Sequence, residues 1–181
     1  ARTAAFTMGR GLFHDAYSHH EAIRSLVDAI GAATDVPQAF TQALGDVRTW
    51  LDLLWLALLV DEGNGCRVRA LASTLPYDAQ TDLAAKLAQY GASQQPGSVL
   101  RPLVAASFPI TLGAGHEALL LAGPKANGEP LRRGERDVLA ALAAMLGAPL
   151  ARGQLLTALQ DRVDELEDHK ATLQHLSLIH I

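Results

Sequence analysis

Apolar side chains recur with a helical period in the first fifty residues. A helix is predicted over residues 12–33, and its apolar stripe, spaced i, i+3, i+4 and i+7, is Ile23, Leu26, Val27 and Ile30. A second helix begins after Asp35, a capping residue, with Pro37 in its first turn. Its stripe is Phe40, Leu44, Val47 and Leu51. Two amphipathic helices therefore open the chain.

The pattern then changes to that of strands. Residues 55–60 are apolar at every position, which predicts a strand covered on both faces. Residues 66–73 alternate, and this alternation predicts that Arg67 and Arg69 lie on a wet face, opposite Cys66, Val68 and Ala70. Glycines and an asparagine at 63–65 are typical of the turn between two such strands. We expect a hairpin.

The apolar pattern and the turn residues also predict the elements after residue 76. A helix is predicted over 77–90 and ends at Gly91, with Leu83 and Leu87 buried. A short edge strand over 99–104 precedes strands over 108–112 and 116–122, which form a second hairpin. Residues 125–128 form a turn, and a helix spans 135–146 with Val138, Leu142 and Met145 on one face. Since proline has no N–H, we expect a kink or a restart at Pro149.

The last segment has the narrow apolar repeat of a coiled coil. Its a and d positions, spaced 3, 4, 3, 4 and 3, are Leu156, Leu159, Val163, Leu166, Lys170 and Leu173. These six positions are called the seam below. An amphipathic surface helix is the alternative, but such a helix usually has a wider apolar face. A coil this short needs a folded domain to support it.

Composition limits the class of protein. The 181 residues suffice for one domain with connecting helices, and 49% of them are hydrophobic. The net charge of −4 includes no basic stripe, so direct contact with nucleic acid is not expected. Cys66 is the single cysteine and favours a reducing, cytoplasmic location. The longest charge-free apolar run, 138–151, is shorter than the roughly 20 residues of a membrane span.

The order helix, helix, hairpin, helix, hairpin, helix, together with one stretch of sequence, resembles GAF domains. The specific part runs from Phe108-Pro109-Ile110-Thr111-Leu112, through Glu117 to Pro124, into the helix that begins at Glu135-Arg136-Asp137. The resemblance implies an α+β, GAF/PAS-like fold. Its antiparallel sheet is flanked by helices, and a C-terminal coiled-coil signalling helix follows. It also implies a pocket on one face of the sheet, lined by residues between 77 and 112.

The flanking segments resemble those of bacterial sensor histidine kinases. Residues 10–17 are similar to the segment that joins a membrane region to a GAF domain, and 159–167 to the helix before the phosphoacceptor helix. We therefore expect a linker helix over 1–34, a sensory domain over 35–150 and a signalling helix over 151–176. The end, 177–181, is expected to be a non-native tail. The native protein is expected to continue into a kinase core, whose motifs this sequence lacks.

The kinase resemblance implies partners. We expect a homodimer that binds a small molecule or relays an upstream signal to the missing module, and a response regulator that is phosphorylated through it. An upstream membrane anchor is compatible with this, so the chain is either cytoplasmic or the cytoplasmic part of a membrane-anchored protein. No cofactor is evident, since ATP would be used by the missing kinase module.

Candidate chemistry is sparse, and the sequence identifies no catalytic or metal-binding residue. His169 and His175 lack the acidic residue that follows a phosphoacceptor histidine, and they are interpreted as solvated. Two adjacent histidines project in different directions from a helix, so a metal site is not expected among His14, His19 and His20.

Three further features have a structural and a chemical interpretation. Cys66 is a small strand residue or a redox or chromophore-attaching thiol, and the first is favoured. The sequence at 113–115, Gly-Ala-Gly, lacks the remainder of a phosphate loop and is interpreted as a hairpin turn. Arg132 and Arg133 precede a helix and could meet an anion, although a solvated turn is favoured.

Two other functions remain open. The chain could be the GAF input domain of a transcriptional regulator or of a cyclic-dinucleotide enzyme, which would keep the sensory role and change the output. It could also be a free-standing GAF-like enzyme, which would need a nucleophile or a metal set inside the pocket.

Overall fold

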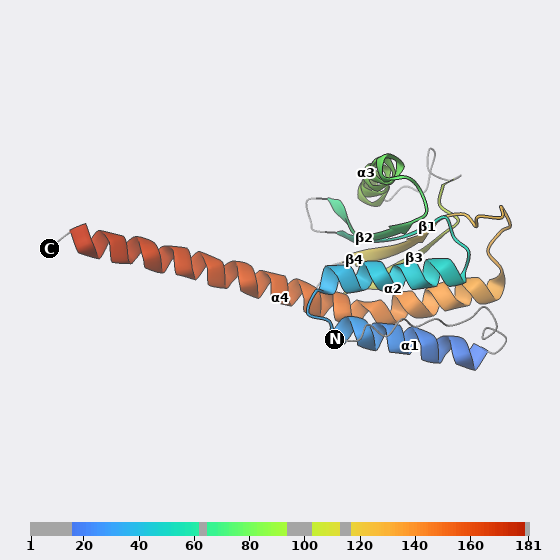
Figure 1. Cartoon of the computed structure of the whole chain (residues 1–181), viewed down its shortest axis with the longest axis horizontal. Helices are drawn as coiled ribbons and strands as arrows, with labels where there is room; N and C mark the ends of the chain where they lie inside the picture. The colour runs from blue at the N-terminus through green and yellow to red at the C-terminus, as the bar shows by residue number, and fades with distance from the viewer. Residues whose placement is uncertain (1–15, 62–64, 94–102, 113–116, 180–181) are drawn as a thin grey trace.

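The computed structural model describes residues 16–61, 65–93, 103–112 and 117–179. In these residues four helices and four strands follow one another in the order helix, helix, hairpin, helix, hairpin, helix (Figure 1). The helices are α1 (Ala16–Ala32), α2 (Val36–Trp50), α3 (Tyr77–Ser93) and α4 (Arg133–Ile179). The strands are β1 (Trp55–Asp61), β2 (Cys66–Ser73), β3 (Ala106–Thr111) and β4 (Glu117–Ala122). The expected α+β architecture is confirmed.

The four strands form one antiparallel sheet in the order β2-β1-β4-β3. The two hairpins therefore meet along β1 and β4, whose central pair is Leu58 opposite Leu120. Residues 55–60 of β1 are all buried, as their continuous apolar run predicts. Because β1 lies in the middle of the sheet, its two sets of alternating side chains face two separate cores.

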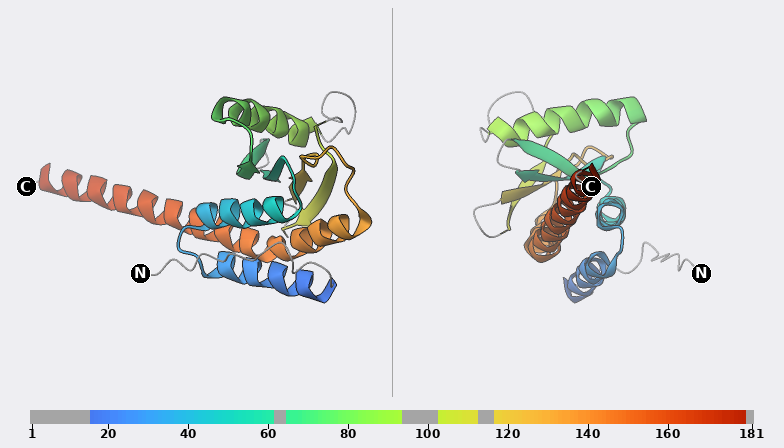
Figure 2. Two further views of the ribbon diagram at one scale, coloured as in Figure 1. Left: turned by 45° about the vertical axis from the view of Figure 1, so that its right-hand side comes forward. Right: turned by 90° about the vertical axis from the view of Figure 1, so that its left-hand side faces the viewer.

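Helices cover both faces of the sheet (Figures 1 and 2). On one face α3 places Leu83 and Leu87 against Trp55, Ala57 and Leu59. On the other face lie α2 and the first half of α4, and α1 packs outside them, against α4 and α2. This larger core joins apolar side chains of three helices and four strands, among them Ile23, Phe40, Val47, Leu58, Leu120, Leu142 and Leu146. We call the α2/α4 side the helical face.

Local chemistry explains several boundaries. The Asp35 carboxylate accepts a hydrogen bond from the Gln38 backbone N–H at 3.1 Å and caps α2, as predicted. The turn after β4 contains Gly128 at φ +73°, and the Asn127 side chain accepts from the Glu129 N–H at 2.9 Å. A β-carbon on Gly123 would lie 2.5 Å from Nε1 of Trp55, so the indole requires glycine at this position.

The expected alternation along β2 is wrong after its first half. Leu58 pairs with Ala70 and the next residue, Leu59, pairs with Val68, so Arg69 is the extra residue of a β-bulge. As a result Cys66 and Val68 pack toward α3, whereas Ala70 and Ala72 face the helical core. Two consecutive residues at the bulge, Arg69 and Ala70, share the helical face, and strict period two does not predict this.

Other boundaries differ by a few residues. The third helix continues through Gly91 to Ser93, because a helical glycine costs only about 1 kcal/mol relative to alanine. The strand expected over 99–104 lies largely outside the described residues, and the part that is described, 103–104, is not a strand. Pairing with β4 instead starts β3 at Ala106, two residues earlier than expected.

Of the two outcomes expected at Pro149, a kink or a restart, the restart does not occur. The last helix is continuous over 47 residues, with Pro149 inside it. Its buried stripe comprises Leu139, Leu142, Ala143, Leu146 and Leu150. Leu146 and Leu150 flank the proline, so burial on both sides holds the helix together although one backbone hydrogen bond is missing. Val138 and Met145, expected on the buried face, are only partly buried.

The apolar part of α4 is long and hydrophobic enough, by length and composition alone, to cross a membrane, with a mean hydropathy of 1.4 over 18 residues. A third of that window is buried inside the protein, where it forms the helical core. Burial in α4 ends near Gly153, whose absent β-carbon would lie 3.4 Å from Cγ1 of Val36. Beyond this point the helix extends away from the sheet (Figure 1).

Candidate functional site

The seam lies on the projecting half of α4. Its first four side chains are large, apolar and exposed: Leu156 by 50%, Leu159 by 61%, Val163 by 49% and Leu166 by 66%. Lys170 is also exposed, and the side chain of Leu173 lies outside the described residues. Within the described residues the tail does not fold back over its own sheet (Figure 2). Apolar side chains gathered along one element in this way are typical of an interaction surface.

Leu155 is also exposed and extends this apolar surface. It precedes Leu156 and lies four residues before Leu159, so its side chain borders the same side of the helix. The heptad pattern omits it because Leu155 is at neither an a nor a d position. A helical-wheel count of all apolar residues after 150 would have included it.

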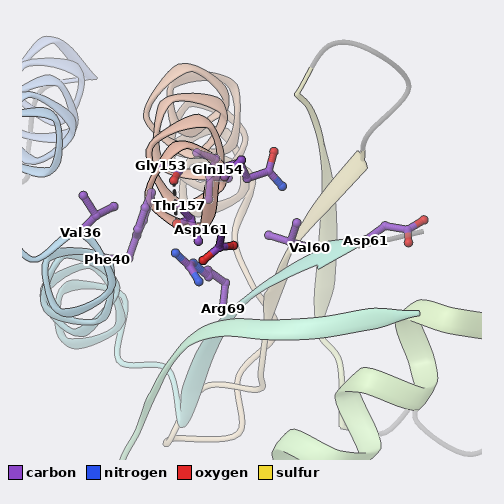
Figure 3. A pocket seen from close by; sticks show the side chains of 11 residues that line it. Val36, Phe40, Val60, Asp61, Arg69, Gly153, Gln154, Thr157 and Asp161 are labelled. Atoms are coloured by element: carbon purple, nitrogen blue, oxygen red, sulfur yellow. Dashed lines mark hydrogen bonds between the residues drawn. The ribbon is translucent and has the colours of Figure 1, made fainter. Parts of the chain in front are cut away.

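A cavity of about 330 Å³ lies where α4 leaves the domain. Its walls come from α2, β1, β2 and α4, and they include Val36, Phe40, Val60, Arg69, Thr157 and Asp161 (Figure 3). The floor is apolar, and the Thr157 hydroxyl donates a hydrogen bond to the Gly153 carbonyl at 3.0 Å. The sequence analysis did not predict this site, because the four segments that form it are far apart in the chain.

Two charged side chains face each other across this cavity. Arg69, from the bulge of β2, and Asp161, from α4, point toward one another in Figure 3. In the part of the chain that the structure describes, neither side chain has a hydrogen-bond or ion-pair partner. A third charged residue, Asp61, also lines the cavity; its side chain points away from Arg69 and Asp161 in Figure 3, and it has an interaction of its own within the protein. The cavity therefore combines an apolar floor with one unpaired positive and one unpaired negative group among the described residues.

The start of α4 is held by an ion pair. The Lys125 Nζ lies 2.7 Å from Oε1 of Glu135, and the exposed fractions of the two side chains are 8% and 21%. The other carboxylate oxygen, Oε2, accepts from the Arg132 backbone N–H at 2.8 Å. Burial opposes ionisation of Glu135, but hydrogen bonds from Lys125 and Arg132 and their charges outweigh it and lower its pKa.

The Glu135 carboxylate occupies a place near Arg132 where the sequence allowed an anion to bind. One N–H at this helix N-terminus, that of Arg132, already donates to a carboxylate of the same chain. The Arg132 side chain is exposed and lies 3.5 Å from the Glu129 carboxylate. The residues predicted as a charged turn therefore stabilise the helix start.

Cys66 has the properties of a structural thiol. It is partly buried beside the core under α3. Burial, and after it the Asp61 carboxylate, raises the pKa of the Cys66 thiol, so less of the reactive thiolate is present at neutral pH. This environment disfavours redox or attachment chemistry.

Only some of the candidate histidines lie among the described residues, and the glycine turn does not. His169 is exposed on the projecting helix. His14 and residues 113–115 lie outside the described residues, as do the side chains of His19, His20 and His175. Within the described ranges, no group of three or more His, Cys, Asp or Glu side chains is placed to hold a metal ion.

The α3 side of the sheet is the side on which the GAF resemblance implies a pocket. There Leu83 and Leu87 are buried against β1 and Leu121 of β4. Residues 94–102, which belong to the expected lining, lie outside the described residues. The cavity at Arg69 is on the opposite face, so the two are different sites.

Comparisons with known proteins support the fold. Neither a scan of protein-family profiles nor a search of curated proteins gave a match. Solved structures do match: a GAF domain from a phosphoenolpyruvate-protein phosphotransferase of Coxiella burnetii has a TM-score of 0.58 at 15% identity, over 80% of this chain and 99% of that one.

Two other solved structures are similar. A GAF domain of a protein described as a sensor histidine kinase of Pseudomonas syringae pv. tomato has a TM-score of 0.53 at 17% identity, over 81% of this chain and 94% of that one. A phycoerythrobilin-bound GAF domain of a cyanobacterial phytochrome has a TM-score of 0.52 at 14% identity, over 77% and 97%. With its antiparallel sheet between α3 and the α2/α4 layer, this chain has the GAF fold.

Proposed function

We propose that this chain is the sensory domain of a bacterial signal-transduction protein, and that two copies associate through the seam on α4. The observation that supports this most directly is the continuity of α4. One helix of 47 residues packs its first half on the sheet and presents exposed apolar side chains on its second half. A change in the sheet or its pockets would therefore act on the same rigid element that carries the dimer contact.

Association would bury the seam. Each fully buried Leu or Val contributes about 1.5–3 kcal/mol relative to an exposed one, and the seam of each copy presents four such side chains within the described residues. A signal requires two arrangements of the helix pair that the ligand or upstream input favours differently. The GAF domain packed on the first half of α4 supplies the support that a coil shorter than three heptads needs.

The association can be tested by sedimentation equilibrium. The double variant Leu159→Asn/Leu166→Asn should raise the dimer dissociation constant by at least about 10-fold, since amides would replace two buried contacts per copy. The matched control is Gln160→Asn/Glu167→Asn, which places the same residues one position outside the seam. Far-UV circular dichroism would verify that both variants fold.

Two results would contradict the association. One is a wild-type chain that stays monomeric at millimolar concentration. The other is a control variant that dimerises as poorly as the seam variant, because the loss would then come from asparagine in the helix and not from the seam.

For the output we propose a two-component sensor histidine kinase, which passes phosphate to a response regulator. The support is the resemblance of residues 159–167 to the helix before the phosphoacceptor helix. The coding sequence after Leu176 tests this: a Glu/Arg-rich helix start with a His-Asp pair would support it. A DNA-binding or cyclic-dinucleotide module there would replace this output and leave the sensory role intact.

A further inference from the structure

The bulge in β2 places Arg69 and Ala70 on the same face of the sheet. Because Leu58 pairs with Ala70 and Leu59 with Val68, Arg69 has no partner of its own in β1 and lies on the helical face beside Ala70. Bulges of this kind redirect a side chain at the cost of one interruption in the ladder. Here the side chain that changes face is Ala70, and beside it the half-buried Arg69 lines the cavity under α4.

The opposite rim carries the complementary charge. Asp161 lies on α4, two turns after Gly153, and its carboxylate faces Arg69 (Figure 3). Each of these two side chains lacks a partner among the described residues, although they face each other. An unpaired, half-buried cation and an unpaired anion that line the same cavity can both be contacted by one small molecule.

Most of the remaining lining is apolar, with Asp61, Gln154 and Thr157 as its polar members, and it favours an apolar body. Phe40 and Val60 line the floor, with Val36 and Leu150 beside them. At about 330 Å³ the cavity is at the lower end of the range for ligand pockets, so the occupant is small. An apolar group on this floor would be removed from water, which contributes about 25 cal/mol per Å² of buried area.

We propose that this cavity binds a small zwitterion with an apolar body. Its carboxylate pairs with the Arg69 guanidinium, its ammonium group pairs with the Asp161 carboxylate, and its apolar part lies on Phe40 and Val60. A ligand with only a negative charge would pair with Arg69 but would be repelled by Asp161. A ligand with only a positive charge would pair with Asp161 but would be repelled by Arg69. Only a molecule with both charges satisfies both rims.

The position gives such a ligand a direct mechanical effect. It would connect β2 to the first free turns of α4, at the point where the helix leaves the body and shortly before the seam. In this respect the inference rests on the proposed sensory function and deepens it. The site lies on the helical face, so it is separate from the expected pocket under α3.

Isothermal titration of the full chain with three matched probes tests the site. L-Norleucine has both charges and a four-carbon side chain, hexanoate lacks its ammonium group, and pentylamine lacks its carboxylate. We expect saturable binding of norleucine and at least about 10-fold weaker binding of the other two, since each loses one charged contact. Absence of saturable binding up to 10 mM norleucine, or hexanoate binding equally well, would overturn the proposal.

Variants locate the binding. Arg69→Met and Asp161→Asn should each weaken norleucine binding by about 10-fold or more. The controls are Arg67→Met, two residues earlier in the same strand, and Asp164→Asn, one turn further along α4; both should bind as the wild type does. Equal binding by Arg69→Met and wild type would place the ligand elsewhere and reject this site.

The binding experiment and the dimerisation experiment can fail independently of each other. A chain that dimerises through the seam but does not bind norleucine would remove this site and leave the sensory role. A chain that binds norleucine through Arg69 and Asp161 but stays monomeric would keep the site and remove the proposed dimer.

Discussion

The carboxylate of Glu135 joins two parts of the molecule through its two oxygens. Oε1 accepts from Lys125, in the turn after β4, and Oε2 accepts from the Arg132 N–H at the start of α4. Lys125 is almost fully buried, and among the described residues the Glu135 carboxylate is the group that compensates its ammonium charge. The position where α4 begins on the sheet is therefore determined by an ion pair together with the adjacent hydrophobic contacts.

Glu135→Gln should lower stability in a pH-dependent way. The folded-state pKa of Glu135 is lowered, so its stabilisation is present above the ordinary glutamate pKa of about 4.3 and is lost as the pH falls through the folded-state value. At pH 7 we expect a loss of about 1–3 kcal/mol in urea unfolding, decreasing toward pH 3. Glu129→Gln, which removes an exposed pair with Arg132, is the control and should change stability by less than about 1 kcal/mol. A loss that is the same at pH 3 and pH 7 would contradict the electrostatic explanation.

At the scale of elements, α4 combines two roles in one helix. Between Arg133 and Gly153 it is a core helix, and beyond Gly153 it is exposed. Pro149 lies within the buried half, where α1 packs beside it: the Arg152 guanidinium donates to the Gly31 carbonyl at 3.1 Å, and the adjoining cleft is lined by Val27 and Ala148. Tertiary contacts thus hold the helix across a residue that disfavours it.

Pro149→Ala should stabilise the domain. Alanine restores an N–H for the Met145 carbonyl and removes a proline that costs about 3 kcal/mol in a helix interior, so we expect a gain of about 1–3 kcal/mol in urea unfolding. Pro37→Ala is the matched control, because Pro37 is in the first turn of α2, where no intrahelical N–H bond is lost. It should give no gain. Destabilisation by Pro149→Ala would mean that packing of the proline ring against α1 outweighs the missing hydrogen bond.

The whole molecule consists of a layered domain and a helix that projects from it (Figure 1). The larger core lies between the sheet and the α2/α4 layer, and the cavity with Arg69 lies where this core ends. The apolar side chains of the projecting part have no contact that would bury them within the described chain. The seam therefore stays exposed to water in the single chain. We propose that a second copy of the chain covers it.

Lys170→Leu should tighten the proposed dimer. A lysine at an a or d position weakens a coiled coil, by analogy with other polar residues there, and Lys170 is exposed in the single chain. We expect the dissociation constant from sedimentation to fall by at least about 10-fold. Lys86→Leu, an exposed lysine of α3 on the other side of the sheet, removes the same charge and should leave dimerisation unchanged. Equal affinity of Lys170→Leu and wild type would remove Lys170 from the interface.

Much of the fold could be predicted from local patterns. The capped start of α2, the buried β1, the bounds of β2 and the turn after β4 follow from residues that are neighbours in the chain. The predictions are wrong where contacts between residues far apart in the chain determine the pairing of a strand or the course of a helix. Examples are the bulge at Arg69 and the extra residues of β3 that pair with β4. The same is true of Pro149, where a restart, one of the two expected outcomes, does not occur. The first four seam residues are exposed on α4, and their role in a dimer stays a prediction. The exposed Leu155 beside them was missed because it lies at neither an a nor a d position.

By itself, the sequence determined the type and order of the elements, because apolar periodicity, capping and turn chemistry act over a few residues. Only the tertiary structure decided which faces of β2 are buried, that α4 stays one helix, and that Arg69 and Asp161 meet across a cavity. These features depend on the pairing of distant strands and on the burial of whole helix faces. The 91 residues between Arg69 and Asp161 in the chain carry no local pattern that brings the two together.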